Sequence, residues 1–181
     1  MIDKIVTYEN TVPRSDEYWT RRMLFASTIL CYKNEYRNFP KTDGATVSEY
    51  IIDKCLPKEY TYIRLYEKEG LSPSQYPCED ALTYESLEHY FSQGFAWVSV
   101  ISHGWYNSTY RKIWAWDDGD CTPSHEKGEI SYISFLDTRF QVTNYGHFSI
   151  AFVATCLTAC VDYSDDCLGE YLTKLSYRGA I

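Results

Sequence analysis

Two apolar segments without a polar face most constrain how this chain can fold. Residues 95–101 read Phe-Ala-Trp-Val-Ser-Val-Ile, and residues 148–154 read Phe-Ser-Ile-Ala-Phe-Val-Ala. A strand that faces water on one side alternates polar and apolar residues, whereas a central strand of a parallel sheet is apolar on both faces. Both segments are therefore predicted to be buried strands of one parallel sheet.

The rest of the chain alternates between helical and strand patterns. Strand patterns occupy residues 23–30 and 60–66, in addition to the two apolar segments, and a further strand is predicted to begin at Ala180. Apolar residues recur at helical spacing from Ile2, in residues 47–55, in residues 84–91 and in residues 168–175. This alternation predicts an α/β fold, in which helices cover a mostly parallel sheet.

Two helix starts are predicted from capping residues. Thr46 and Glu49 match a capping box ahead of the 47–55 helix. Asp165 or Asp166 is predicted to cap the 168–175 helix.

The predicted domain organisation is simple. The 181 residues, 45% of them hydrophobic, fit one domain with a substantial core. Residues 105–147 are rich in Trp, Asp, Gly and Ser, and we interpret them as an insertion within that domain. A helix opens the chain without a preceding strand, and the last strand has barely begun, so we expect a domain that is truncated at both ends.

Charge and hydropathy exclude several classes of protein. The formal net charge of −8 argues against nucleic-acid binding, which needs clustered Lys and Arg. The apolar runs are far shorter than the roughly 20 residues of a membrane helix. The first residues have no apolar region typical of a signal peptide, so none is predicted in this chain.

Two reactive side chains follow the two apolar strands. His103 comes two residues after the first strand, and Cys156 comes two residues after the second. Because active sites of open α/β sheets lie at the carboxyl ends of the strands, His103 and Cys156 are predicted to meet at one sheet edge. A thiolate beside an imidazole is an effective nucleophile, and Gly104 leaves a backbone N–H unshielded, as an oxyanion hole requires.

The cysteines leave other interpretations open. There are seven, so at least one thiol is outside any internal disulfide. Cys156, Cys160 and Cys167, together with a histidine, could instead hold a structural zinc ion. Cys78 and Cys121 lie in loop-like segments and could pair if the protein is exported.

Several segments resemble the gingipain-type cysteine peptidases, relatives of the caspases. The resemblance runs in the same order from residue 3 to residue 181. The segments that carry it are Asp3-Lys4-Ile5-Val6-Thr7-Tyr8-Glu9 with Trp19, the strand leading into Ser102-His103-Gly104, residues 152–158 around Cys156, Cys167-Leu168-Gly169-Glu170, and Gly179-Ala180-Ile181. Ser102 and Ala159 stand where the family usually has glycine.

The resemblance implies a fold, a reaction and a location. The fold would be a three-layer caspase-like sandwich. Cys156, rather than Cys160, would be the nucleophile and His103 the general acid and base, with the N–H groups of Gly104 and Cys156 as the oxyanion hole. The reaction would be hydrolysis of protein or peptide substrates through a thioacyl-enzyme, outside the cell or at its surface.

Substrate contacts are predicted from the insertion. Asp117 and Asp118, with Asp120, are candidates for a pocket that accepts a basic substrate side chain, or for a calcium site; otherwise they form a solvated acidic loop. Trp105, Trp114 and Trp116 are candidates for the wall of the substrate cleft, or else they pack the insertion. Glu170 is expected to cap the helix or to form a pair near its start, rather than to act in catalysis. No other cofactor is predicted.

Two other functions remain open from the sequence. One is a catalytically inactive caspase-like module that binds a peptide or a partner protein. The other is a metal-stabilised structural domain.

Overall fold

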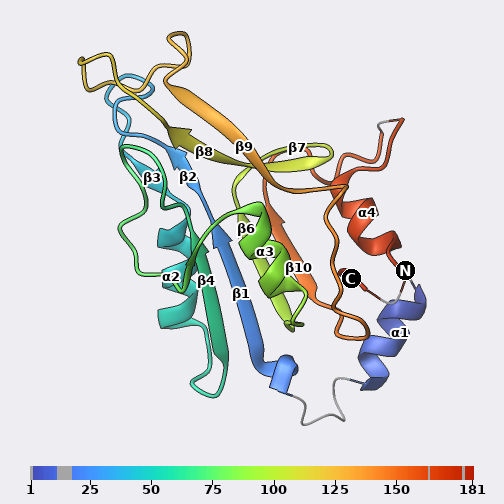
Figure 1. Ribbon diagram of the computed structural model, residues 1–181. Coiled ribbons are helices and arrows are strands. Elements are labelled where there is room, and N and C mark those ends of the chain that lie inside the picture. Colours follow the sequence, from blue (N-terminus) through green and yellow to red (C-terminus); the bar gives the residue numbers. More distant parts are fainter. Residues whose placement is uncertain (1, 12–17, 163, 177) are drawn as a thin grey trace.

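A central sheet of five parallel strands organises the molecule (Figure 1). The computed structural model describes residues 2–11, 18–162, 164–176 and 178–181. The strand order is β10 (Ile150–Ala154), β6 (Trp97–Ile101), β1 (Arg22–Ser27), β4 (Thr61–Tyr66) and β5 (Asp80–Ala81). All four pairings are parallel, which confirms the predicted α/β class.

Helices cover both faces of this sheet. Helix α2 (Ala45–Lys54) packs on the face that carries Phe25 and Tyr66. Helices α3 (Tyr84–Phe91) and α4 (Leu168–Lys174) pack on the opposite face, against Leu24 and Val100. Helix α1 (Ile2–Thr11) lies beside α4, where Lys4 Nζ donates to Leu172 O at 3.2 Å. A short 3-10 helix (Tyr18–Arg21) precedes β1. No described helix has the length and apolar character that would let it cross a membrane.

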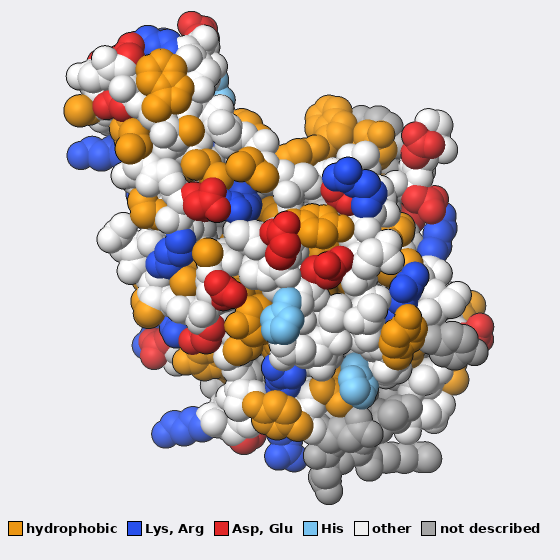
Figure 2. Space-filling model, viewed as in Figure 1, with side chains coloured by type: hydrophobic (Ala, Val, Ile, Leu, Met, Phe, Trp, Pro, Cys, Tyr) orange, Lys and Arg blue, Asp and Glu red, His pale blue; other side chains and the backbone are white. Residues whose placement is uncertain are grey.

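The segment predicted as an insertion supplies most of a second, antiparallel sheet, which begins before it, at His103. Its strands are β7 (His103–Trp105), β8 (Ser108–Trp114) and β9 (Ile130–Asp137). The far end of the β8–β9 hairpin stands out from the body as a projection at the upper left of Figure 2. The near end of the segment supplies fully buried Phe135, Phe140 and Val142 to the main core.

The register between β6 and β10 fixes where the two strands end. Ala154 pairs with Ile101, and Ser102 N donates to Ala154 O at 3.3 Å just beyond that pair. His103 and Cys156 are each two residues past the pair. The register of the sheet therefore brings the two strand ends together, as expected from the sequence.

The strand predicted at 23–30 is two strands. Its second part is β2 (Ile29–Cys31), which pairs with β3 (Thr42–Asp43). Thr28 separates the two parts. Its N–H donates to Ile101 O at 3.1 Å and its carbonyl accepts from Gly44 N at 3.0 Å, so the chain leaves the main sheet at this residue.

Both predicted helix caps are wrong. Helix α2 begins at Ala45, before Thr46, and Asp43 Oδ1 accepts the Ala45 N–H at 2.9 Å. Helix α4 is preceded by Cys167, whose N–H donates to Glu170 Oε2 at 3.1 Å. Glu170 therefore has the capping role expected of it, whereas Asp166 forms an ion pair with Lys174.

Strand β10 is buried on one side only, contrary to the prediction for residues 148–154. Ile150 and Phe152 are 37% and 50% exposed, respectively. Phe152 stacks on Trp97 at 6.3 Å between ring centroids. Both rings line an apolar groove, which is also lined by Ile51 of α2 and by Leu56 just after that helix. Since α2 packs against β1 and β4, it does not extend over β10.

A substitution at Phe140 tests how much the segment that contains the second sheet contributes to the stability of the main core. The Phe140 ring is fully buried between Tyr84 and Phe91, at 5.4 and 6.0 Å between centroids. Phe140→Ala should lower the free energy of unfolding by about 3–5 kcal/mol, because it leaves a cavity between α3 and β9. The matched change at half-exposed Phe39 should alter it by less than about 0.5 kcal/mol. Urea denaturation followed by circular dichroism measures both, and equal effects would contradict the assignment of Phe140 to the core.

Candidate active site

His103 lies at the junction of the two sheets, with its imidazole half-buried. Nε2 lies 3.2 Å from Ile29 O. A carbonyl oxygen can only accept, so this hydrogen bond requires the proton on Nε2 and leaves Nδ1 with a free lone pair. Burial, and after it the positive charge of Lys112, lower the pKa of His103 below its usual 6.5. The ring is therefore neutral near pH 7 and able to accept a proton at Nδ1.

Cys156 lies in a tight turn directly after β10 and is exposed. The next residue, Leu157, has a φ of 60°, a left-handed conformation that is uncommon for a residue with a branched side chain. The hydroxyls of Thr155 and Thr158 lie 2.7 Å apart and close this turn. The turn thus presents the thiol to solvent at the carboxyl end of the sheet.

Gly104 brings the two strand ends into direct contact. A Cβ at this position would lie 2.7 Å from Cys156 O and 2.8 Å from Thr155 Cβ, so only glycine fits without moving the backbone. In the described part of the chain, no hydrogen bond joins the His103 ring to the Cys156 thiol, and the Cys156 N–H has no acceptor. The two groups are neighbours across one opening rather than bonded partners.

That opening is a shallow pocket at the meeting point of the strands. Its volume is about 380 Å³. It is lined by His103, Gly104, Trp105, Tyr110, Tyr132 and Cys156. The structure therefore brings together His103, Gly104, Cys156 and Trp105 of the residues singled out from sequence. Tyr110 and Tyr132 were missed, because their place depends on the pairing of β8 with β9.

Tyr132 is in contact with the histidine. Its ring meets the His103 ring edge-on, with centroids 5.4 Å apart and an interplanar angle of 88°. The ring also stacks on His125, at 6.0 Å and 19°. The imidazole of His103 is thus held between Ile29 O and an aromatic wall from β9.

A buried ion pair lies behind this wall. The side chains of Lys112 and Glu35 are almost fully buried and bonded to each other. Glu35 also accepts from Tyr32 N at 2.8 Å and from His125 Nε2 at 2.7 Å. Burial alone would raise the pKa of Glu35, but the hydrogen bonds from Lys112, Tyr32 and His125 outweigh it, and the pKa lies below its usual value. The sequence pattern does not predict this ion pair, because Glu35 and Lys112 meet only through the tertiary packing of β8 against β2.

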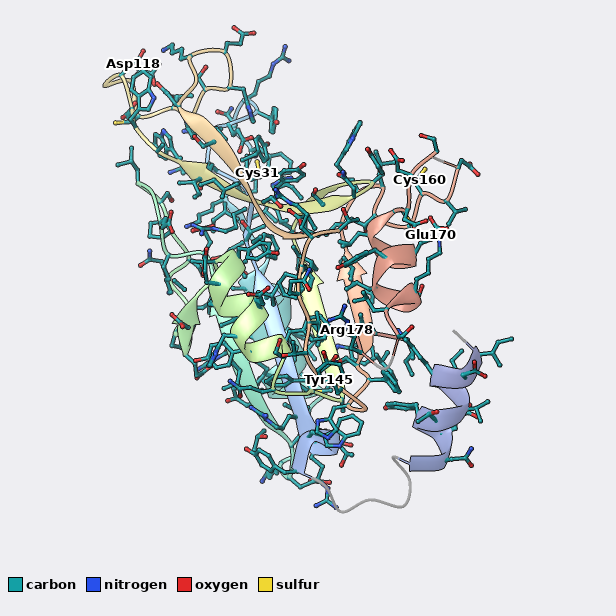
Figure 3. All side chains as sticks on the ribbon, turned by 45° about the vertical axis from the view of Figure 1, so that its right-hand side comes forward. Cys31, Asp118, Tyr145, Cys160, Glu170 and Arg178 are labelled. Carbon is teal, nitrogen blue, oxygen red and sulfur yellow. The ribbon has the colours of Figure 1, made fainter. Side chains whose placement is uncertain are left out.

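Asp117 and Asp118 do not line the pocket. They lie at the far end of the β8–β9 hairpin, where Figure 3 labels Asp118, on the opposite side of the view from Cys160. Carboxylate oxygens of Asp117, Asp118 and Glu129 come within 4.8 Å of one another, and Lys127 forms an ion pair with Asp118 at 2.5 Å. The structure thus places these aspartates away from the pocket beside Cys156, and their roles in substrate or calcium binding stay predictions.

The cysteines do not form the zinc site considered from sequence. All seven are free thiols, so Cys78 and Cys121 form no disulfide. Among the described residues, the group of metal-ligating side chains that converges consists of carboxylates alone. Cys167 is buried at the start of α4, while Cys156 is exposed.

Comparison with known proteins agrees with the fold and with the family resemblance. The model of peptidase family C25 matches residues 1–181. Lys-gingipain HG66 of Porphyromonas gingivalis is 23% identical over 180 residues, which cover 99% of this chain and 8% of that protein.

Two solved structures share the fold. One is the Arg specific cysteine proteinase gingipain R, with a TM-score of 0.59 and 15% identity, and 99% of this chain matches 34% of it. The other is described as a protease, with a TM-score of 0.60 and 18% identity, and 99% of this chain matches 31% of it. The chain spans about a third of those structures and less of the curated relative. Because the family model matches the whole chain, the chain belongs to peptidase family C25, a family of cysteine peptidases.

Proposed function

We propose that this chain carries the catalytic dyad of a cysteine endopeptidase, with Cys156 as the nucleophile and His103 as the general acid and base. One observation carries the proposal. The two side chains lie two residues beyond the same registered pair of neighbouring parallel strands, and they line one pocket. Membership of the C25 family supports the reaction class.

The hydrogen bond of His103 gives each ring nitrogen a role. Nε2–H donates to Ile29 O and holds the ring, so Nδ1 is the nitrogen that accepts the proton of the Cys156 thiol. The thiolate then attacks the substrate carbonyl carbon. The Nδ1 proton passes to the leaving amine, the C–N bond breaks, and a thioacyl-enzyme remains. Water attacks that thioester while Nδ1 takes its proton, and this proton returns to the departing sulfur.

The oxyanion hole is proposed to be formed by the N–H groups of Gly104 and Cys156. The close approach of Gly104 to the Cys156 backbone puts both near the pocket. The Cys156 N–H has no acceptor among the described residues, so it is available to a developing oxyanion.

The substrates are proposed to be proteins or peptides, in line with the family. The extracellular or cell-surface location implied by the resemblance stays a prediction. The 105–147 insertion likewise stays a prediction as a domain boundary.

Alkylation with iodoacetamide tests the dyad. Cys55, Cys121 and Cys156 are all exposed, so accessibility alone predicts similar rates. An ordinary thiol, with a pKa near 8.5, is only about 1% ionised at pH 6.5. If His103 takes the thiol proton, Cys156 should react roughly 10–100 times faster than Cys55 and Cys121 at that pH. Peptide mapping by mass spectrometry measures the three rates in one sample.

The matched control is His103→Ala, in which the advantage of Cys156 should disappear. Equal rates at all three exposed cysteines in the unaltered chain would argue for the catalytically inactive module instead. Cys156→Ala should abolish peptide hydrolysis, whereas Cys160→Ala should not.

The pH profile of kcat/KM tests the state of His103. Burial lowers its pKa, so the neutral ring persists below pH 6.5 and the acid limb of the profile should lie below that value. The groups that face His103 are Lys112, Glu35 and Tyr132. Tyr132→Ala admits water, weakens the desolvation and should move the limb to higher pH, while Tyr132→Phe keeps the ring and should not. A limb unmoved by Tyr132→Ala would contradict the shielding role.

A further inference from the structure

Aromatic rings beside the thiol form the wall of the pocket. Trp105, Tyr110 and Tyr132 account for three of its six lining residues. Trp105 and Tyr132 are 49% and 44% exposed, so much of their surface remains in water. Exposed aromatic surface gathered in a concave site is typical of ligand recognition. Burying an aromatic or large aliphatic side chain there removes its apolar surface from water, which favours binding.

The same wall offers no carboxylate to a cationic side chain. None of the residues that line the pocket is Asp or Glu. The buried Glu35 is already bonded to Lys112 and His125. Asp118 and Asp120 form ion pairs with Lys127 at the far end of the hairpin. A Lys or Arg side chain would lose its hydration in this pocket without gaining a charged partner.

Lys112 makes the pocket still less suited to a cation. Its Nζ lies 5.9 Å from the centroid of the Tyr132 ring, and also over the rings of Tyr32 and Tyr36. The cation–π interaction that Tyr132 could offer to a substrate is thus already used within the protein. Because Lys112 is paired with Glu35, the groups behind the wall offer no unpaired negative charge to an incoming ammonium or guanidinium group.

These observations, taken with the proposed function on which they rest, point to one substrate class. We infer that the pocket selects an aromatic or large aliphatic side chain on the residue that supplies the scissile carbonyl. The names of the two gingipains matched above refer to Arg and Lys. The pocket of this chain offers neither an Arg nor a Lys side chain a charged partner, because none of its lining residues carries a carboxylate.

Covalent peptidyl acyloxymethyl ketones that differ only in that side chain test the inference. The probes carry Phe, Leu, Arg or Lys, and the measured quantity is the second-order rate constant for modification of Cys156 in the full chain. The Phe and Leu probes should react at least about tenfold faster than the Arg and Lys probes. Arg or Lys probes that react as fast or faster would overturn the inference while leaving the dyad intact. Failure of every probe to react faster than in His103→Ala would instead overturn the proposed function and the inference with it.

Two tryptophans provide a matched pair of variants. Trp105→Ala removes part of the wall and should reduce the Phe-to-Arg rate ratio several-fold. Trp116 is similarly exposed, at 47%, but lies outside the pocket, so Trp116→Ala should leave the ratio unchanged. Trp105→Asp adds the missing carboxylate and should raise the rate with the Arg probe. A ratio that is insensitive to Trp105→Ala would count against the assignment of the pocket.

Discussion

The parallel pairing of β6 with β10 is the constraint on which the rest of the structure depends. Two paired parallel strands have their carboxyl ends at the same edge of the sheet. The pairing of Ala154 with Ile101 therefore sets the positions of the residues that follow both strands. A shift of one residue in this register would turn every side chain of β10 to the other face. It would also separate Cys156 from the level of His103, so sheet register and site geometry are one property.

The second sheet supports that edge through packing and through charge. Gly104 belongs to β7 and touches the backbone after β10, so the antiparallel sheet begins at the site itself. Further along, Lys112 of β8 meets Glu35 in the interior. Removing one partner of such a pair leaves an isolated buried charge, which typically destabilises a protein by about 3–5 kcal/mol. This pair ties the wall of the pocket to the loop after β2.

The features that could be predicted from sequence are those set by local pattern and strand topology. The apolar runs predicted the parallel strands, and the helical spacing predicted α3 over its full length. The positions of the two strand ends predicted that His103, Gly104 and Cys156 lie close together. The sequence pattern does not predict the places of Tyr110 and Tyr132, which depend on long-range strand pairing in the second sheet. Nor does it predict the place of Glu35, which depends on the packing of β8 against β2. Asp117 and Asp118 lie away from the pocket for the converse reason: they are close to His103 in sequence, but β8 carries them to the far end of a hairpin.

The wide separation of the paired strands has a consequence for biosynthesis. Strand β6 pairs with β1 about seventy residues earlier and with β10 about fifty residues later, so the sheet has a high contact order. Until β10 docks, Cys156 and His103 lie on separate segments, and the pocket has no floor. The nascent chain therefore holds a thiol and an imidazole that cannot cooperate.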